Sequence, residues 1–288
     1  MTEFTLEFDR YKLELGPKTC IMGILNATPD SFSDGGRFNT VDRAVRQGLK
    51  LVEDGAHILD IGGESSRPFA APVPEQEELD RVIPVIEALA KQISVPISID
   101  TVKSVVAKHA LDAGASIIND ITAFERDPAM ADLAAERQAP VILMHMKGTP
   151  ETMQVNPDYD DLMTEITSYL ASRADYAIQK GIRKDHIILD PGIGFGKTVE
   201  HNLVLIRHLE KITALGFPVL VGPSRKSFIQ NILSGKGKKP VGPDHVRTEY
   251  GTLAAVAASI MNGAHIVRVH DVEKLNPFTR ILDSIRNA

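Results

Sequence analysis

The chain has 288 residues, of which 43% are hydrophobic, and it carries a formal net charge of −6. This length suits one large domain, and the acidic balance argues against a general nucleic-acid binder, which usually presents a basic surface. No apolar stretch approaches the roughly 18 residues that a membrane helix needs. The single cysteine, Cys20, permits no internal disulfide and suits a reducing cytosol. We therefore expect one cytoplasmic domain over residues 1–288, with neither a membrane nor a nucleic acid as partner.

The first predicted elements form a β-hairpin. Segments Thr5–Phe8 and Lys12–Leu15 alternate apolar with polar residues on either side of a short turn, which is the pattern of two half-buried strands. We expect this hairpin to close the bottom of the larger fold that follows.

Eight short apolar runs then alternate with amphipathic segments of helical length. The runs are Thr19–Leu25, His57–Leu59, Pro96–Ile99, Ser116–Ile118, Pro140–Met144, His186–Leu189, Pro218–Gly222 and His265–Val267. The helical segments are Asp42–Asp54, Pro74–Gln92, Lys103–Ala113, Met130–Gln138, Tyr159–Lys180, Glu200–Ala214, Ser227–Leu233, Glu249–Asn262 and Val272–Arg286. Glycine follows five of these helices, where a left-handed cap residue is wanted. The pattern predicts an α/β protein, a (β/α)₈ TIM barrel with an N-terminal hairpin.

Nearly every apolar run ends in a residue that can do chemistry, and barrel active sites lie at these strand ends. Asp100, Asn119 and Asp190 end the third, fourth and sixth runs, and Lys226 follows the seventh. One such residue alone would most simply cap the next helix. Three around one barrel mouth indicate a ligand, and they suit a heterocycle whose ring edge carries N–H, NH₂ and C=O groups.

Arg268 and His270 lie two residues apart after the eighth run, so their side chains share a face of the strand. The guanidinium and imidazole N–H groups can donate hydrogen bonds to phosphate oxygens. An isolated Arg–His pair is nevertheless more often a structural contact. Beside Lys226, on neighbouring strands seven and eight, the pair falls where barrels commonly bind phosphate. We therefore expect an anion site here.

The glycine-rich segment Asp190–Thr198 has some likeness to an ATP-binding P-loop. That motif requires glycine at the position where this chain has Pro191, so we reject it. The glycines more simply let the backbone approach a flat ligand, with Phe195 as an apolar surface. His145 lacks a partner at metal-binding spacing and is interpreted as a hydrogen-bonded structural residue, and Met144 as packing.

Two long loops, Asn26–Thr40 and Gly62–Pro74, follow strand ends and should overhang the active face. Residues 234–244, rich in Gly, Lys and Pro, are a third candidate for mobility.

Taken together, these segments resemble the dihydropteroate synthases of the pterin-binding barrel family. The resemblance runs from Thr19 to Ile285, and its motifs in chain order make a specific match. They are MGILNATPDSFSDGG (22–36), DIGGESSRP (60–68), SIDT (98–101), NDI (119–121), MHMKGTP (144–150), DPGIGFGK (190–197), GPSRKSF (222–228) and RVH (268–270).

The resemblance implies a reaction in which a 7,8-dihydropterin carrying a CH₂-pyrophosphate loses pyrophosphate, and 4-aminobenzoate takes its place to give 7,8-dihydropteroate. It implies a pterin site of Asp100, Asn119, Met144, Asp190, Phe195 and Lys226, with Asp100, Asp190 and Lys226 as catalytic groups. Pyrophosphate would contact Ser66, Arg268 and His270, with Mg²⁺ held at Asn26. The aminobenzoate pocket would comprise Phe32, Asp34, Arg67, Pro68 and Ser227. A homodimer and competition by sulfonamides are further expectations of the resemblance.

Departure of pyrophosphate before attack of the amine is consistent with these residues. Cations neutralise the leaving group, an electron-rich ring stabilises the carbon, and loop closure excludes water. The chain departs from the family at Ser66, commonly Thr, and at Phe69, commonly Gly. Two alternatives stay open: a corrinoid-linked pterin methyltransferase and a non-catalytic pterin-binding relative.

Overall fold

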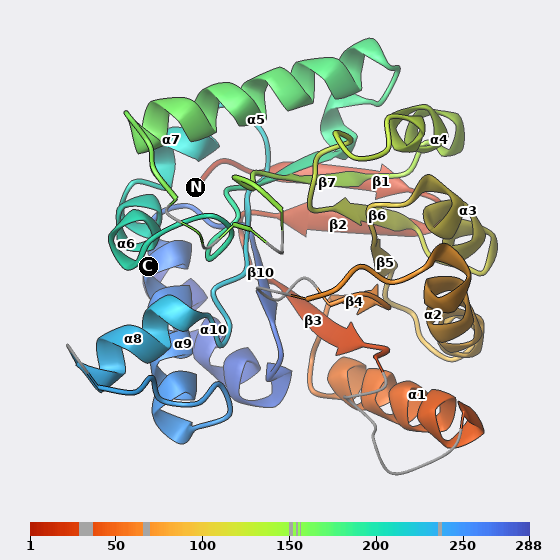
Figure 1. Ribbon diagram of the computed structural model, residues 1–288, viewed down its shortest axis with the longest axis horizontal. Helices are drawn as coiled ribbons and strands as arrows, with labels where there is room; N and C mark the ends of the chain where they lie inside the picture. Colours follow the sequence, from red (N-terminus) through yellow and green to blue (C-terminus); the bar gives the residue numbers. More distant parts are fainter. Residues whose placement is uncertain (29–36, 66–69, 150–151, 154, 156, 236–237) are drawn as a thin grey trace.

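The computed structural model describes residues 1–28, 37–65, 70–149, 152–153, 155, 157–235 and 238–288. Figure 1 shows the strands at the centre with the helices around them. The strands are β1 (Phe4–Phe8), β2 (Tyr11–Leu15), β3 (Cys20–Asn26), β4 (Ile58–Gly62), β5 (Ile97–Asp100), β6 (Ile117–Asp120), β7 (Val141–Met144), β8 (Ile187–Asp190), β9 (Leu220–Val221) and β10 (Ile266–Val269). The helices are α1 (Arg37–Glu53), α2 (Glu75–Ala90), α3 (Ser104–Asp112), α4 (Ala129–Arg137), α5 (Leu162–Gln179), α6 (Val199–Arg207), α7 (Glu210–Thr213), α8 (Ser227–Ser234), α9 (Val246–Met261) and α10 (Val272–Arg286).

The eight strands β3–β10 form one parallel sheet in the order β8-β7-β6-β5-β4-β3-β10-β9. A parallel bridge between Leu189 and Val219 joins β8 to the start of β9, and the Leu189 N–H donates to the carbonyl of Pro218 at 2.9 Å. These contacts close the sheet, so the predicted eight-stranded barrel is confirmed. Strand β9 is shorter than predicted because the prolines that flank it, Pro218 and Pro223, have no N–H for the ladder.

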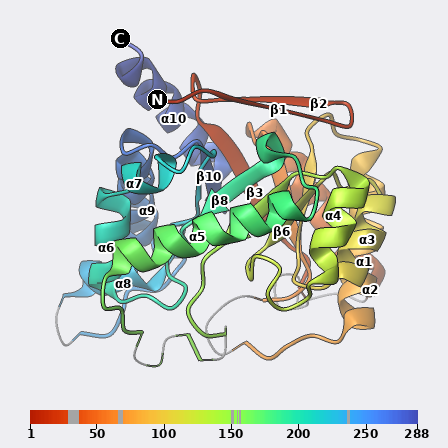
Figure 2. The same ribbon diagram turned by 90° about the horizontal axis from the view of Figure 1, so that it is seen from above.

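Alternation along the strands divides the core into two layers. One set of side chains packs outward against the helices. The other set points into the barrel and joins Leu6, Phe8 and Leu15 of the hairpin. Figure 2 shows β1 and β2 lying across one end of the barrel. Nε2 of His186 lies 3.0 Å from the carbonyl oxygen of Glu7 in β1, and Nε2 of His265 lies 3.0 Å from the carbonyl oxygen of Thr2, just before β1. The hairpin therefore covers the N-terminal strand ends, as predicted, and leaves the C-terminal ends for the site.

The helices depart from prediction mainly at their ends. Helix α5 begins at Leu162 rather than Tyr159, because the Asp161 side chain accepts the Thr164 N–H at 3.0 Å and caps the helix there. The predicted segment 200–214 is two helices, α6 and α7, separated at His208. Gly55 and the four other glycines placed after helices all have positive φ, as the cap interpretation requires. No helix in the described ranges is long and apolar enough to cross a membrane.

Candidate active site

Polar side chains replace apolar ones at the C-terminal end of the barrel interior. Ile58 and Ile117 belong to the apolar layer over the hairpin. Two residues further along the same strands, and therefore on the same face, stand Asp60 and Asn119. The strand register places Asp100 directly beside Asn119. One end of the barrel interior is therefore an apolar plug, and the other holds a cluster of polar side chains, which we call the pocket.

Arg268 joins two carboxylates across this pocket. Its Nε donates to Oδ2 of Asp60 at 2.6 Å, and its Nη2 donates to Oδ2 of Asp100 at 2.8 Å. Asn119 donates its side-chain N–H to the same Asp60 oxygen at 3.2 Å. Asp60 is fully buried, and its Oδ1 has no hydrogen-bond partner among the described residues. Burial raises the pKa of Asp100, and the Arg268 charge opposes that rise.

Asp60 was not among the predicted site residues. The sequence signal was present, since Asp60 ends an apolar run just as Asp100 does. Its position under Arg268 follows from the barrel closing β4 onto β3 and β3 onto β10, which no local pattern shows.

Asp190 and Lys226 approach the pocket from the other side. Asp190 accepts the Gly192 N–H through Oδ1 at 2.7 Å, and burial raises its pKa to about 6. The Lys226 ammonium lies 3.8 Å from the centroid of the Phe195 ring, within the range of a cation–π contact. Phe195 packs in turn with Met144 in a small apolar cluster. The structure thus brings these four predicted residues together.

His270 lies beyond Arg268 at the end of β10. Its Nδ1 is 2.9 Å from Oγ of Ser224, and its backbone N–H donates to the same hydroxyl at 3.3 Å. Ser224 is buried, so it fixes the imidazole orientation. Ser224 lies in the GPSRKSF motif (222–228), and no role was predicted for it.

The remaining predicted residues come from the ends of β3, β4 and α8. Asn26 is half-buried at the end of β3, and Ser227 is exposed at the start of α8. The predicted residues Phe32, Asp34, Ser66, Arg67 and Pro68, and the unusual Phe69, lie outside the described residues. Their roles stay predictions.

Within the described part of the chain, no group of three or more His, Cys, Asp or Glu side chains could hold a metal ion. Mg²⁺ does not need such a group when a substrate supplies phosphate oxygens, because it keeps several waters and takes one or two protein ligands. The side-chain carbonyl of Asn26, beside the pocket, is an oxygen ligand of that kind. The donor set therefore fits a magnesium ion carried by a diphosphate.

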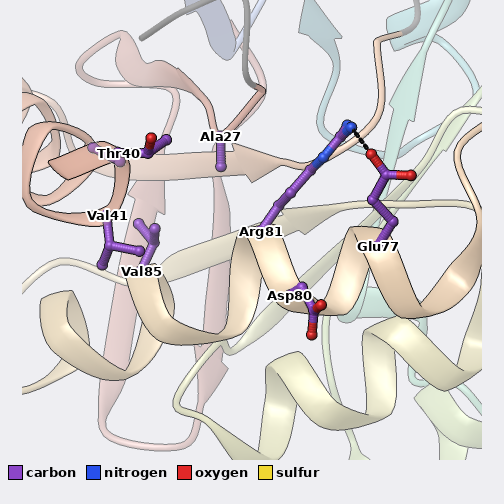
Figure 3. Close-up of a pocket in the computed structure, with 8 residues that line it drawn as sticks. Ala27, Thr40, Val41, Glu77, Asp80, Arg81 and Val85 are labelled. Atoms are coloured by element: carbon purple, nitrogen blue, oxygen red, sulfur yellow. Dashed lines mark hydrogen bonds and ion pairs between the residues drawn. The ribbon is translucent and has the colours of Figure 1, made fainter. Parts of the chain in front are cut away.

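A separate cavity of about 290 Å³ lies between α1 and α2. Figure 3 shows its lining, with Arg81 paired to Glu77 across one wall. Arg81 also donates to the Gly63 carbonyl at 2.6 Å, which ties α2 to the segment after β4. The lining residues are Ala27, Thr40, Val41, Ala44, Glu77, Asp80, Arg81 and Val85. Ala27 belongs to the layer of side chains packed against the helices, so the cavity lies between the barrel and its helices rather than inside the barrel.

The fold and the polar strand ends define a (β/α)₈ barrel protein with charged groups gathered at one end of the barrel. Residues 22–270 match the family model described as "Pterin binding enzyme". A dihydropteroate synthase of Synechocystis is 48% identical over 94% of this chain and 91% of its own. The structure of Yersinia pestis dihydropteroate synthase with a sulfonamide drug complex has a TM-score of 0.91 at 43% identity, covering 99% of this chain and 100% of that one. Xanthomonas albilineans dihydropteroate synthase with 4-aminobenzoic acid has a TM-score of 0.90 at 42% identity, covering all of both chains.

The chain therefore belongs to the pterin-binding enzymes and, among them, to the dihydropteroate synthases, transferases of folate synthesis. The predicted family, barrel and activity are confirmed. The relatives named above are dihydropteroate synthases, and they favour the synthase over the methyltransferase and the non-catalytic alternative.

Proposed function

We propose that the polar end of the barrel binds 6-hydroxymethyl-7,8-dihydropterin pyrophosphate and joins its methylene carbon to the amine of 4-aminobenzoate. The observation that carries this assignment is the convergence of Asp100, Asn119 and Asp190 in one buried pocket beside Lys226 and Phe195. Carboxylate and amide oxygens accept hydrogen bonds from the ring N–H and NH₂ groups, and the amide and ammonium donate to the ring carbonyl. Phe195 and Met144 cover the ring with apolar surface.

The pyrophosphate is proposed to contact Ser66, Arg268 and His270, near Lys226. When bound with the diphosphate at Asn26, Mg²⁺ would neutralise charge on the leaving group. Arg268 already spans Asp60 and Asp100, so its position is set before substrate arrives. This preorganisation lowers the entropy lost when an anion binds.

In the proposed reaction the carbon–oxygen bond to pyrophosphate breaks first, and the carbon becomes cationic. The negative charges of Asp100 and Asp190 stabilise that carbon through the ring. The amine nitrogen then forms the new bond and loses its proton to solvent. An aromatic amine is neutral near pH 7, so a strong general base is not required. Phe32, Asp34, Arg67, Pro68 and Ser227 are proposed to shape the aminobenzoate pocket.

The direct test combines a reaction with a binding variant. Purified protein, the dihydropterin pyrophosphate, Mg²⁺ and labelled 4-aminobenzoate should yield labelled 7,8-dihydropteroate, and chelation of Mg²⁺ should suppress it. Lys226→Ala should raise the KM for the pterin substrate at least tenfold, because the ring loses a charged donor. Lys184→Ala, an exposed lysine near the other end of β8, is the matched control. An unchanged KM in Lys226→Ala would refute the pocket assignment.

A homodimer is proposed to form through α6, α8 and α9, which pack together. Each exposes a large apolar side chain, with 46% exposure for Leu203, 50% for Ile232 and 66% for Tyr250. Neighbouring exposed apolar groups mark interaction surfaces. Sedimentation should show a dimer that Tyr250→Glu dissociates; a monomeric wild-type protein would contradict it. We further propose that residues 1–288 act as one domain in the cytoplasm, consistent with the single cysteine.

A further inference from the structure

Lys197 is a buried lysine that takes no part in the proposed reaction. It ends the glycine-rich segment after β8, and its exposed fraction is 3%. An ammonium removed from water is costly unless its hydrogen bonds are replaced. A lysine at this position therefore needs a set of acceptors.

Three acceptors surround the Lys197 ammonium. Its Nζ lies 3.0 Å from Nδ1 of His145, 3.3 Å from the His145 carbonyl and 2.8 Å from the Phe195 carbonyl. An ammonium has three N–H donors, so all three are accounted for. Because Nδ1 of His145 accepts, the ring is neutral; burial and the Lys197 charge lower the pKa of His145 to about 3. This geometry also shows why Lys197 does not act as the P-loop lysine that it resembles in sequence.

The two segments that Lys197 joins are packed in direct contact. A Cβ on Gly192 would lie 2.0 Å from the His145 carbonyl oxygen, and one on Gly196 would lie 2.4 Å from the Lys147 carbonyl oxygen. The segment after β8 therefore lies directly on the segment after β7. The His145 ring is further held by the Tyr169 ring, edge to face at 4.9 Å.

Phe195 connects this contact to the pocket. Its carbonyl accepts the shortest Lys197 hydrogen bond, while its ring lies under the Lys226 ammonium at 3.8 Å. Asp190, at the start of the same segment, receives the His145 backbone N–H through its carbonyl at 3.0 Å. A displacement of Lys197 would therefore shift Phe195 and loosen the segment 190–197, which begins at Asp190.

We propose that Lys197 and His145 are positioning residues for the pterin substrate, holding the segments after β7 and β8 together so that the Phe195 ring stays against Lys226. The proposal rests on the assignment of the pterin pocket made above. It gives a role to His145, which the sequence left as a structural residue, and it accounts for a buried lysine that the proposed reaction does not use.

The test compares KM values for the two substrates. Lys197→Met keeps the chain length and removes the donors; it should raise the KM for the pterin substrate at least tenfold. The KM for 4-aminobenzoate, measured at saturating pterin, should change less than twofold. Lys184→Met, at an exposed lysine preceding β8, should change neither value.

Two variants at His145 test the hydrogen bond that Nδ1 of His145 accepts from the Lys197 ammonium. His145→Asn keeps an oxygen close to the Nδ1 position, whereas His145→Leu removes it, and both lose the ring contact with Tyr169. We expect His145→Asn to retain a pterin KM at least threefold lower than that of His145→Leu. The double variant Lys197→Met/His145→Leu should raise the pterin KM by less than the product of the two single effects, because each single variant already loses the Lys197–His145 hydrogen bond.

A folded Lys197→Met protein with a wild-type pterin KM would overturn the proposal. If Lys197→Met does not fold, the His145 pair decides, and equal pterin KM values for Asn and Leu would overturn it. Lys226→Ala distinguishes failure of the positioning role from failure of the pterin-pocket assignment. If Lys226→Ala weakens pterin binding while the Lys197 and His145 variants do not, the positioning role alone fails. If none of them weakens pterin binding, the pocket assignment fails as well.

Discussion

Asp190→Asn is expected to make the protein more stable and a poorer enzyme. Asp190 is 7% exposed, and burial raises its pKa from 3.8 to about 6. Between these two pH values the folded state binds more protons than the unfolded state, so the stability contributed by this group falls as pH rises. Above about pH 6 the buried charge carries its full cost. Asparagine removes the charge and keeps an oxygen that can accept the Gly192 N–H, which is 2.7 Å from Asp190.

The size of the effect follows from the pKa difference. One unit corresponds to about 1.4 kcal/mol, so a rise of about two units corresponds to about 3 kcal/mol in the free energy of unfolding. The variant should therefore gain about 3 kcal/mol at pH 7.5. The gain should shrink to less than about 1 kcal/mol at pH 4, where Asp190 is protonated in the folded protein and partly protonated in the unfolded chain.

Urea unfolding at pH 7.5 and pH 4, followed by circular dichroism, measures this difference, and the KM for the pterin substrate should rise at least tenfold in the same variant. Asp185→Asn is a suitable control, because Arg183 lowers the pKa of that exposed carboxylate and its removal should bring no gain. The reasoning is refuted if Asp190→Asn unfolds at lower urea than the wild-type protein at pH 7.5, or if the gain is the same at both pH values.

Two other substitutions test the packing of the site. Asp60→Ala should lower the free energy of unfolding by about 3–5 kcal/mol, because it removes one partner of a buried ion pair and leaves Arg268 with a single carboxylate; an unchanged urea midpoint would contradict this. Gly192→Ala should destabilise by several kcal/mol, since its φ is +69° and the new Cβ would lie 2.0 Å from the His145 carbonyl oxygen. A wild-type melting temperature for Gly192→Ala would show that the two segments separate freely.

The fold was predictable because each of its elements leaves a local signal. A strand buried on both faces reads as a short apolar run, and eight such runs with helices between them leave few arrangements. Strand β9 was the least well predicted: five residues were expected and two are regular. Proline at each end of that run limits the ladder, and closure depends instead on the bridge from Leu189 to Val219.

The site was predictable as a set of residues but not as a set of contacts. Asp100, Asn119 and Asp190 were identified from their positions after apolar runs, and the structure brings them to one pocket. Arg268 was predicted as an anion ligand, and its ion pairs with Asp60 and Asp100 were not. These partners are 208 and 168 residues away in sequence, and only the closed barrel brings them within hydrogen-bonding distance.

The sequence alone determined that this chain is a barrel with chemistry at its strand ends, because side-chain alternation and strand polarity are local properties of each βα unit. Only the tertiary structure decided which contacts each of the polar groups makes. Arg268 is held between two carboxylates, and the ammonium of Lys197, in the glycine-rich segment, contacts His145 and the Phe195 carbonyl. These contacts depend on which strands become neighbours and on how closely two segments pack, and neither can be predicted from a single segment of the sequence.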